Sequence, residues 1–264
     1  MTRLAHERYC DEIAHQVGEL RSVVTSGTDL SRAVPTTPDW SLEQLVRHLG
    51  GALRWVALMV RTGAERRPRG GRAELRRARG ARGRRRAGRL AGGERRPRRR
   101  RAEEAGPDAR VWSWAGVGNA GFWARRMTHE VTVHRADATL AAGLPYDVAP
   151  EVAADAVDEW LEIVEWAQRT LPDDEVHGLR GPLRTIHLHA TDTAPDGAAE
   201  WLIRLDEEGV SWSHGHEKAT VALRGPLTWV LLAFYRRVPL DDPRIEVLGE
   251  RAVLEHWLER ATFG

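Results

Sequence analysis

The sequence predicts an α+β protein in which a set of helices precedes a small mixed domain. Through most of the first 170 residues, apolar side chains recur at steps of three and four, as on one face of a helix. From residue 171 the pattern changes to short runs in which apolar and polar residues alternate, which is typical of half-buried strands. A chain of 264 residues is long enough for two domains, and we expect them to be residues 1–170 and 171–264.

Four segments of the helical domain are predicted to form long helices. The apolar period places them at residues 4–26, 42–61, 122–140 and 150–169. Ser41 is the predicted N-cap of the second helix, and Gln44 three residues later completes a capping box. Pro150 suits the first turn of the last helix, because a proline there removes no hydrogen bond that the helix needs.

In the second domain, the segments TIHLHAT, AEWLIRLD, GVSWSH and ATVALR are expected to form short antiparallel strands. A helix (PLTWVLLAFYRR), a strand (RIEVLG) and a last helix (ERAVLEHWLERA) follow. Alternation places His187 and His189 on one side of their strand, and His214 and His216 form a similar pair across a glycine. Either pair could bind metal, but no third ligand is evident, so we interpret both pairs as polar positions on a sheet face.

Charge is unevenly distributed along the chain. The formal net charge is only +2, yet residues 61–110 hold 20 of the 40 basic side chains and only 6 of the 38 acidic ones. Residues 64–107 are rich in arginine and glycine and show almost no amphipathic period. Because so little apolar surface cannot offset the entropy of ordering, we expect this insert to be mostly disordered.

Two interpretations of the insert remain open. Dense arginine could bind nucleic acid or another anionic surface, although the segment lacks the aromatic residues that single-strand binders use for stacking. The alternative, which we favour, is an out-of-frame stretch of a GC-rich gene that replaces the segment between the second and third predicted helices. Nucleic acid is therefore not the expected partner.

The predicted helix over 122–140 carries the candidate site. Glu130 and His134 are four residues apart and therefore lie one turn apart on the same face, together with Trp123 and Met127. An unpartnered carboxylate on an inward face would cost several kcal/mol, and a shared divalent metal would compensate it. The dipeptide His129-Glu130 does not form a zincin motif, because His129 and His134 are five residues apart and diverge around the helix.

A third ligand is predicted on the second helix. His48 lies on its apolar face, where a lone histidine is more often a core residue than a ligand. A facing helix that presents Glu130 and His134 favours the ligand interpretation. Two imidazole nitrogens and one carboxylate oxygen leave an open position on a zinc-like ion, as in catalytic sites.

These residues carry a resemblance to a known family. The segments TPDWSLEQLVRHLGG, GFWARRMTHEVTVHRADA, HLHATD and VALRGP resemble the mycothiol-dependent maleylpyruvate isomerase family, which belongs to the DinB-like metal-binding four-helix bundles. The resemblance covers nearly the whole chain outside the insert. It implies an up-down N-terminal bundle whose metal ligands correspond to His48, Glu130 and His134, with zinc as the expected metal and mycothiol as the thiol cofactor.

The resemblance also implies an activity. The expected function is a mycothiol-dependent isomerase or S-transferase acting on a small organic acid or electrophile, with Arg204 as a candidate for binding an anionic substrate. The alternatives are a non-catalytic metal-binding protein and a nucleic-acid-binding protein. A single cysteine, no apolar leader and no apolar run long enough to cross a bilayer lead us to expect a cytoplasmic protein without membrane contacts. The sequence does not indicate an oligomeric state.

Overall fold

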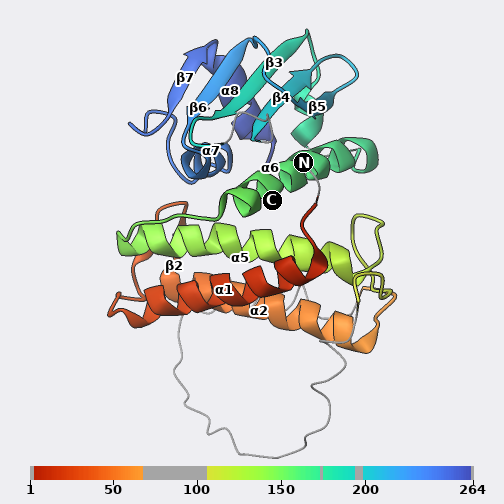
Figure 1. The fold of residues 1–264 in the computed structure, drawn as a ribbon, viewed down its shortest axis with the longest axis vertical. Helices are drawn as coiled ribbons and strands as arrows, with labels where there is room; N and C mark the ends of the chain where they lie inside the picture. Colours follow the sequence, from red (N-terminus) through yellow and green to blue (C-terminus); the bar gives the residue numbers. More distant parts are fainter. Residues whose placement is uncertain (1–2, 68–105, 173–174, 194–198, 263–264) are drawn as a thin grey trace, which may run out of the picture. The chain divides into compact units, whose positions relative to one another are not determined.

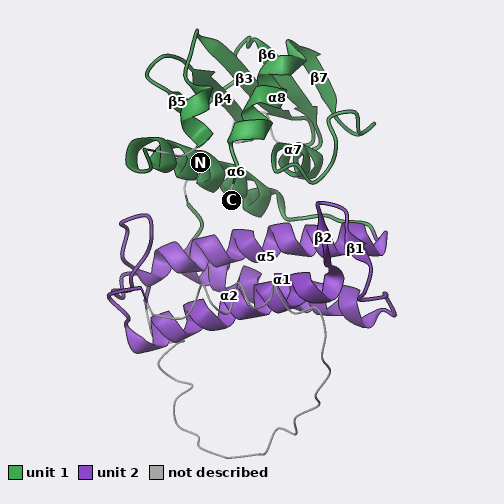
Figure 2. Cartoon of the chain, turned by 180° about the vertical axis from the view of Figure 1, so that it is seen from behind, with its two compact units in different colours: residues 1–4, 145–264 green, residues 5–144 purple. Residues whose placement is uncertain are grey.

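A computed structural model describes residues 3–67, 106–172, 175–193 and 199–262. These residues form two compact units, Ala5–Leu144 and Met1–Leu4 with Pro145–Gly264 (Figure 2). Helix α6 (Pro150–Thr170) lies in the second unit, so the division comes earlier than the expected boundary at residue 170. The physical reason is that α6 packs against α7, β5 and η1 of that unit.

The first unit is helical, as predicted. Its long helices are α1 (His6–Thr25), α2 (Leu42–Thr62) and α5 (Ala120–Ala142) (Figure 1). A small antiparallel pair, β1 (Ala33–Val34) and β2 (Thr37–Ser41), connects α1 to α2. Both α1 and α2 pack against α5. The core between them contains the fully buried Leu45, Leu49 and Val131.

Local signals set the ends of the two helices that carry the candidate site. The predicted capping box is confirmed, because Ser41 Oγ accepts a hydrogen bond from the Gln44 amide and Gln44 Oε1 accepts one from the Ser41 amide. Helix α5 begins after Asn119, whose Oδ1 accepts a 2.8 Å hydrogen bond from the Phe122 amide. It ends at Gly143 with φ +72°, a left-handed conformation that favours glycine.

The second unit contains a five-stranded sheet with strand order β5-β4-β3-β6-β7. Neighbours are antiparallel except β3 and β6, which pair in parallel, so the expectation that the strands are all antiparallel is wrong at that position. The connection from β5 to β6 returns the chain past β4 to the far side of β3. The elements after α6 are η1 (Glu175–Leu179), β3 (Arg184–Ala190), β4 (Glu200–Leu205), β5 (Val210–His214), β6 (Val221–Gly225), α7 (Leu227–Phe234), β7 (Glu246–Gly249) and α8 (Arg251–Arg260).

The sheet has one apolar and one polar face, which follows from the alternation along each strand. Ile186 and Leu188 of β3 are fully buried on the face that α7 and α8 cover, and Phe234 and Trp257 of those helices stack on each other. His187 and His189 alternate with these residues and therefore lie on the opposite face. The α+β fold class is confirmed.

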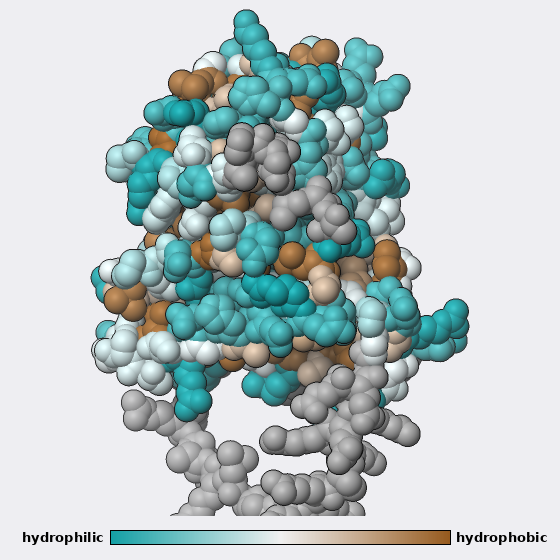
Figure 3. Space-filling view, viewed as in Figure 1, coloured by the Kyte–Doolittle hydropathy of each residue, from teal (hydrophilic) through white to brown (hydrophobic). Residues whose placement is uncertain are grey.

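Two expectations concern regions beyond this framework. Most of the arginine-rich insert, residues 68–105, lies outside the described residues, so both interpretations of it stay open. Among the helices that the structure describes, none is long and apolar enough to cross a membrane. The surface in Figure 3 is largely hydrophilic, with apolar side chains in scattered patches.

Candidate metal centre

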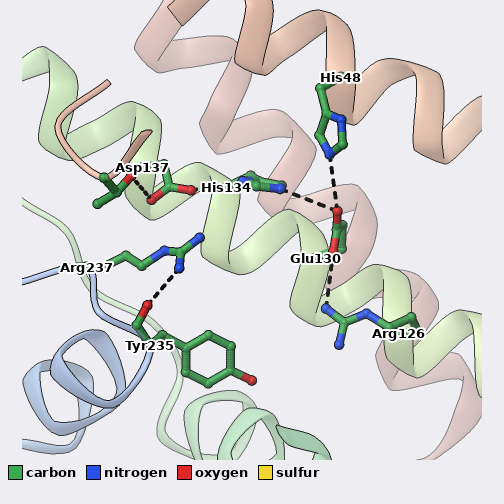
Figure 4. Close-up of polar contacts among 8 residues, drawn as sticks. His48, Arg126, Glu130, His134, Asp137, Tyr235 and Arg237 are labelled. Carbon is green, nitrogen blue, oxygen red and sulfur yellow. Dashed lines mark hydrogen bonds and ion pairs between the residues drawn. The ribbon is translucent and has the colours of Figure 1, made fainter. Parts of the chain in front are cut away.

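The three predicted ligands come together in the helical unit. His48 projects from α2, while Glu130 and His134 project from successive turns of α5 (Figure 4). One possible ligand atom from each residue lies within 4.8 Å of the others. Nothing in the local sequence brings α2 and α5 together, so this convergence is produced by the packing of the two helices on their shared core.

The distances among these atoms suit a metal ion. Glu130 Oε1 lies 3.6 Å from His48 Nε2 and 3.3 Å from His134 Nε2. Ligands bonded to a tetrahedral zinc ion at about 2.0–2.1 Å are about 3.3 Å apart, so only small side-chain movements would be needed to bind one. The imidazole rings of His48 and His134 meet edge to face at 5.3 Å, which leaves both Nε2 atoms directed at the same carboxylate.

His134 is held by a chain of hydrogen bonds behind it. Its Nδ1 lies 2.9 Å from Asp137 Oδ2, and the hydroxyl of Thr36 donates a 2.7 Å hydrogen bond to Asp137 Oδ1. Asp137 is completely buried. A carboxylate at Nδ1 keeps the proton on that nitrogen and leaves Nε2 as the free ligand atom, which is the usual support of a metal-binding histidine.

Two other side chains adjoin the ligands. Arg126, one turn before Glu130 on α5, lies 3.3 Å from Glu130 Oε2, the oxygen that faces away from the histidines. Trp40 of β2 contacts the ring of His48 edge to face. Arg126 could have been found from its i, i+4 spacing to Glu130, whereas Thr36 gave no signal because it is 101 residues from Asp137.

The electrostatics of the centre are strongly perturbed. Burial acts to lower the pKa of His134, but its contacts with Asp137 and Glu130 raise that pKa to about 9. Burial acts to raise the pKa of Glu130, yet His134, His48 and Arg126 together hold it well below its usual range. In metal-free protein, the His134 imidazolium therefore lies between the carboxylates of Asp137 and Glu130. A divalent cation bound at the centre would replace the positive charge of that imidazolium.

Other polar side chains of this unit lie away from the centre. His129 is buried against the ring of Tyr9, and Arg135 contacts Gln16 of α1. Cys10 Sγ lies 3.8 Å from His6 Nε2, but burial and the nearby Asp11 and Glu7 raise the pKa of its thiol, which disfavours the reactive thiolate.

The predicted residues of the second unit give a mixed result. Arg204 lies on β4, where its guanidinium pairs with Glu217 at 3.3 Å, and its predicted role in binding a substrate stays a prediction. The interpretation of His214 and His216 as a pair is wrong. His214 turns to Asp158, with its Nε2 3.1 Å from the carboxylate, whereas His216 joins His187 and His189 around Glu200.

Asp137 offers a direct test of the support behind His134. We expect Asp137→Asn to weaken zinc binding at this centre by about 10–100-fold, because the neutral amide orients the imidazole less firmly. Competition with a chromophoric chelator measures the change. The exposed Asp39 on β2 provides the matched control, since Asp39→Asn removes one carboxylate from the strand that leads into α2 but should leave affinity unchanged. If Asp137→Asn and Asp39→Asn bound zinc with equal affinity, Asp137 would have no role in supporting the site.

The fold and the site define an α+β protein whose helical unit carries a candidate centre of two histidines and a glutamate. Residues 10–139 match the mycothiol maleylpyruvate isomerase N-terminal domain, and residues 151–256 match the MDMPI C-terminal domain. The chain therefore belongs to the mycothiol-dependent maleylpyruvate isomerase family, which is a family of enzymes. The second match begins within α6, consistent with the grouping of that helix in the second unit.

Other comparisons contribute little. Among curated proteins, none matches the chain at a significant level. One solved structure with some similarity is a double mutant of the sec-alkyl sulfatase PisA1, which is 14% identical with a TM-score of 0.29. The match covers 55% of this chain and 25% of that chain, so this chain spans a quarter of the sulfatase's length.

Proposed function

We propose that the protein is a mycothiol-dependent metalloenzyme in which His48, Glu130 and His134 hold a divalent ion, most suitably zinc. The observation that carries this proposal is the convergence of the three ligand atoms from two helices within 4.8 Å. Membership of a family named for a mycothiol-dependent isomerase supports the thiol. The reaction is the addition of that thiol to a small unsaturated or electrophilic substrate, either for isomerisation or for thiol transfer.

The donor set suits catalysis. Three protein ligands leave a coordination position for an exchangeable group, and a bound zinc ion would lower the pKa of a thiol so that the nucleophilic thiolate forms at neutral pH. The Asp137 carboxylate accepts a hydrogen bond from the Nδ1–H of His134 and so fixes the direction of His134 Nε2. Arg126 partners the second oxygen of Glu130, which leaves Oε1 for the ion.

The proposed reaction needs no reactant other than the thiol and the substrate. The thiolate sulfur forms a bond to one carbon of an activated double bond, and the electron pair moves into the conjugated carbonyl. Rotation about the resulting single bond and expulsion of the thiolate restore the double bond in the trans geometry and return the thiol unchanged. In a transfer reaction, the adduct takes up a proton and leaves with the sulfur attached, so the thiol is consumed.

An assay of purified protein tests this function. Zinc-loaded protein should convert maleylpyruvate only when mycothiol is present, or should consume mycothiol with an electrophile, and metal-stripped protein should do neither. Consumption of the thiol separates transfer from isomerisation. Folded, zinc-loaded protein that shows no thiol-dependent turnover with either substrate class would favour the alternative of a non-catalytic metal-binding protein.

A further inference from the structure

A second cluster of metal-ligating side chains lies on the polar face of the sheet. We propose that His187, His189, Glu200 and His216 form a second divalent-metal site, independent of the centre in the helical unit. One possible ligand atom from each of these residues lies within 4.8 Å of the others. The proposal concerns the sheet alone and does not depend on the proposed enzymatic function.

Strand register brings the four residues together. His187 and His189 are two residues apart on β3 and share a face of the sheet. Glu200 of β4 lies directly opposite His189 in the antiparallel pair. The chain then returns along β5, and directly after that strand the Gly215 amide donates a hydrogen bond to the Glu200 carbonyl. This contact places His216 beside the Glu200 side chain.

Three imidazoles converge on a single carboxylate oxygen. Glu200 Oε2 lies 2.8 Å from His187 Nε2, 3.0 Å from His189 Nδ1 and 2.6 Å from His216 Nδ1. The ring centroids are 5.0–5.5 Å apart. A hydrogen-bonded carboxylate does not require three nitrogens on one oxygen, and a modest outward movement of the imidazoles would give the spacing of about 3.3 Å between ligands of one zinc ion.

The hydrogen bonding in the cluster is incomplete. His189 Nδ1 is buried and makes no hydrogen bond of normal geometry, although Glu200 Oε2 is only 3.0 Å away. A buried nitrogen without a satisfactory partner costs free energy. Coordination of an ion between Nδ1 and the carboxylate would satisfy it.

The charge state of the cluster is compatible with a cation. Burial lowers the pKa of His187 despite its contact with Glu200, which favours the neutral imidazole that a metal ligand requires. Burial acts to raise the pKa of Glu200, but contacts with His189, His216 and His187 lower it. When coordinated to a divalent ion, three imidazole ligands and one carboxylate would leave a net charge of about +1.

The neighbouring cations on this face are already paired. Arg224 of β6 lies beside His189 in the parallel register, and its guanidinium contacts Glu246 at 2.9 Å. Arg204 of β4 pairs with Glu217. These partners offset the repulsion that two arginines would otherwise exert on a metal ion in the cluster.

The donor set indicates both the metal and its role. Three imidazoles with one carboxylate suit zinc, and cobalt(II) is a spectroscopic substitute with the same preferred geometry. Four protein ligands fill a tetrahedral shell, which is typical of a structural site rather than a catalytic one. The ion would tie β3, β4 and the segment after β5 together, and so stabilise the sheet.

Metal counting on the full chain tests the site. The double variant His48→Gln/His134→Gln removes two ligands of the first centre and should still bind one zinc ion per chain after dialysis, as measured by elemental analysis. Adding His216→Gln should abolish that ion and the tetrahedral cobalt(II) absorption. His216 is 69% exposed, so its replacement is the least disruptive to folding. Adding His214→Gln instead removes a nearby imidazole outside the cluster and should leave one ion bound.

A second measurement guards against misfolding of the double variant. In the otherwise unaltered chain, His216→Gln alone should lower the zinc content by one ion per chain and reduce the thermal stabilisation that added zinc produces. The proposal is overturned if the folded double variant holds no zinc, or if His216→Gln and His189→Gln both bind as much zinc as the unaltered chain.

Discussion

Replacing both His48 and His134 with alanine should remove the zinc ion of the helical unit and abolish thiol-dependent turnover. The two imidazoles supply two of the three ligand atoms, and Glu130 alone cannot retain the ion. An activating metal contributes several kcal/mol to the reaction, which corresponds to a loss of at least about 10³-fold in rate. Elemental analysis and the mycothiol-dependent assay measure the two effects on one preparation.

The control for this experiment is another helical histidine of the same unit. His15 lies exposed on α1, so His15→Ala removes an imidazole without touching the centre and should change neither zinc content nor rate. Zinc bound at the sheet would persist in the double variant, so the expected change is one ion per chain. The site in the helical unit would be refuted by a double variant that keeps both its full zinc content and its activity.

The pH dependence of the metal-free protein should be opposite in sign to that of zinc binding. His134 has a pKa of about 9 in the fold and about 6.5 when unfolded. Because the folded pKa is the higher one, the imidazolium stabilises the fold fully below about pH 6.5, and this contribution is lost as the pH rises towards 9. The loss amounts to about 3 kcal/mol, measurable by urea unfolding of chelator-treated protein.

Zinc binding should strengthen over the same range. The ion requires a neutral imidazole, so below about pH 9 it must displace a proton from His134. The zinc affinity should therefore decrease about tenfold for each unit by which the pH is lowered below 9. Competition with a chelator at pH 7, 8 and 9, in the His216→Gln background, isolates the helical site. The control His134→Gln lacks the titrating group, so its metal-free form should not show the loss of unfolding free energy between pH 6.5 and 9. A zinc affinity that is constant from pH 7 to 9 would contradict the assigned charge state.

The helices and strands could largely be predicted because their signals are local. The capping box at Ser41 and Gln44 depends on residues within one turn, and it appears in the structure as expected. The same holds for the strands around His187 and Trp201, whose alternation reflects which side chains face the core. Periodicity does not determine which strands become neighbours, and the parallel pairing of β3 with β6 was therefore missed.

The candidate site was predicted to different degrees. The pairing of Glu130 with His134 follows from the helical period alone. His48 was predicted from its position on an apolar helix face and was supported by the family resemblance, but only tertiary packing joins α2 and α5. The hydrogen bond from Thr36 to Asp137 spans 101 residues and had no local signal.

The sequence by itself determined the α+β class, the positions of the helices and strands in the described residues, and the pairing of Glu130 with His134 on one helical face. Those features depend on the periods of 3.6 residues in a helix and 2 residues in a strand, which can be recognised within a short segment of the sequence. Only the tertiary structure decided that α6 belongs with the sheet, that His214 and His216 separate, and that His216 meets Glu200 and the histidines of β3. Such contacts depend on strand register and on the turn at Gly215, and a single-residue shift in that register would place a side chain on the opposite face.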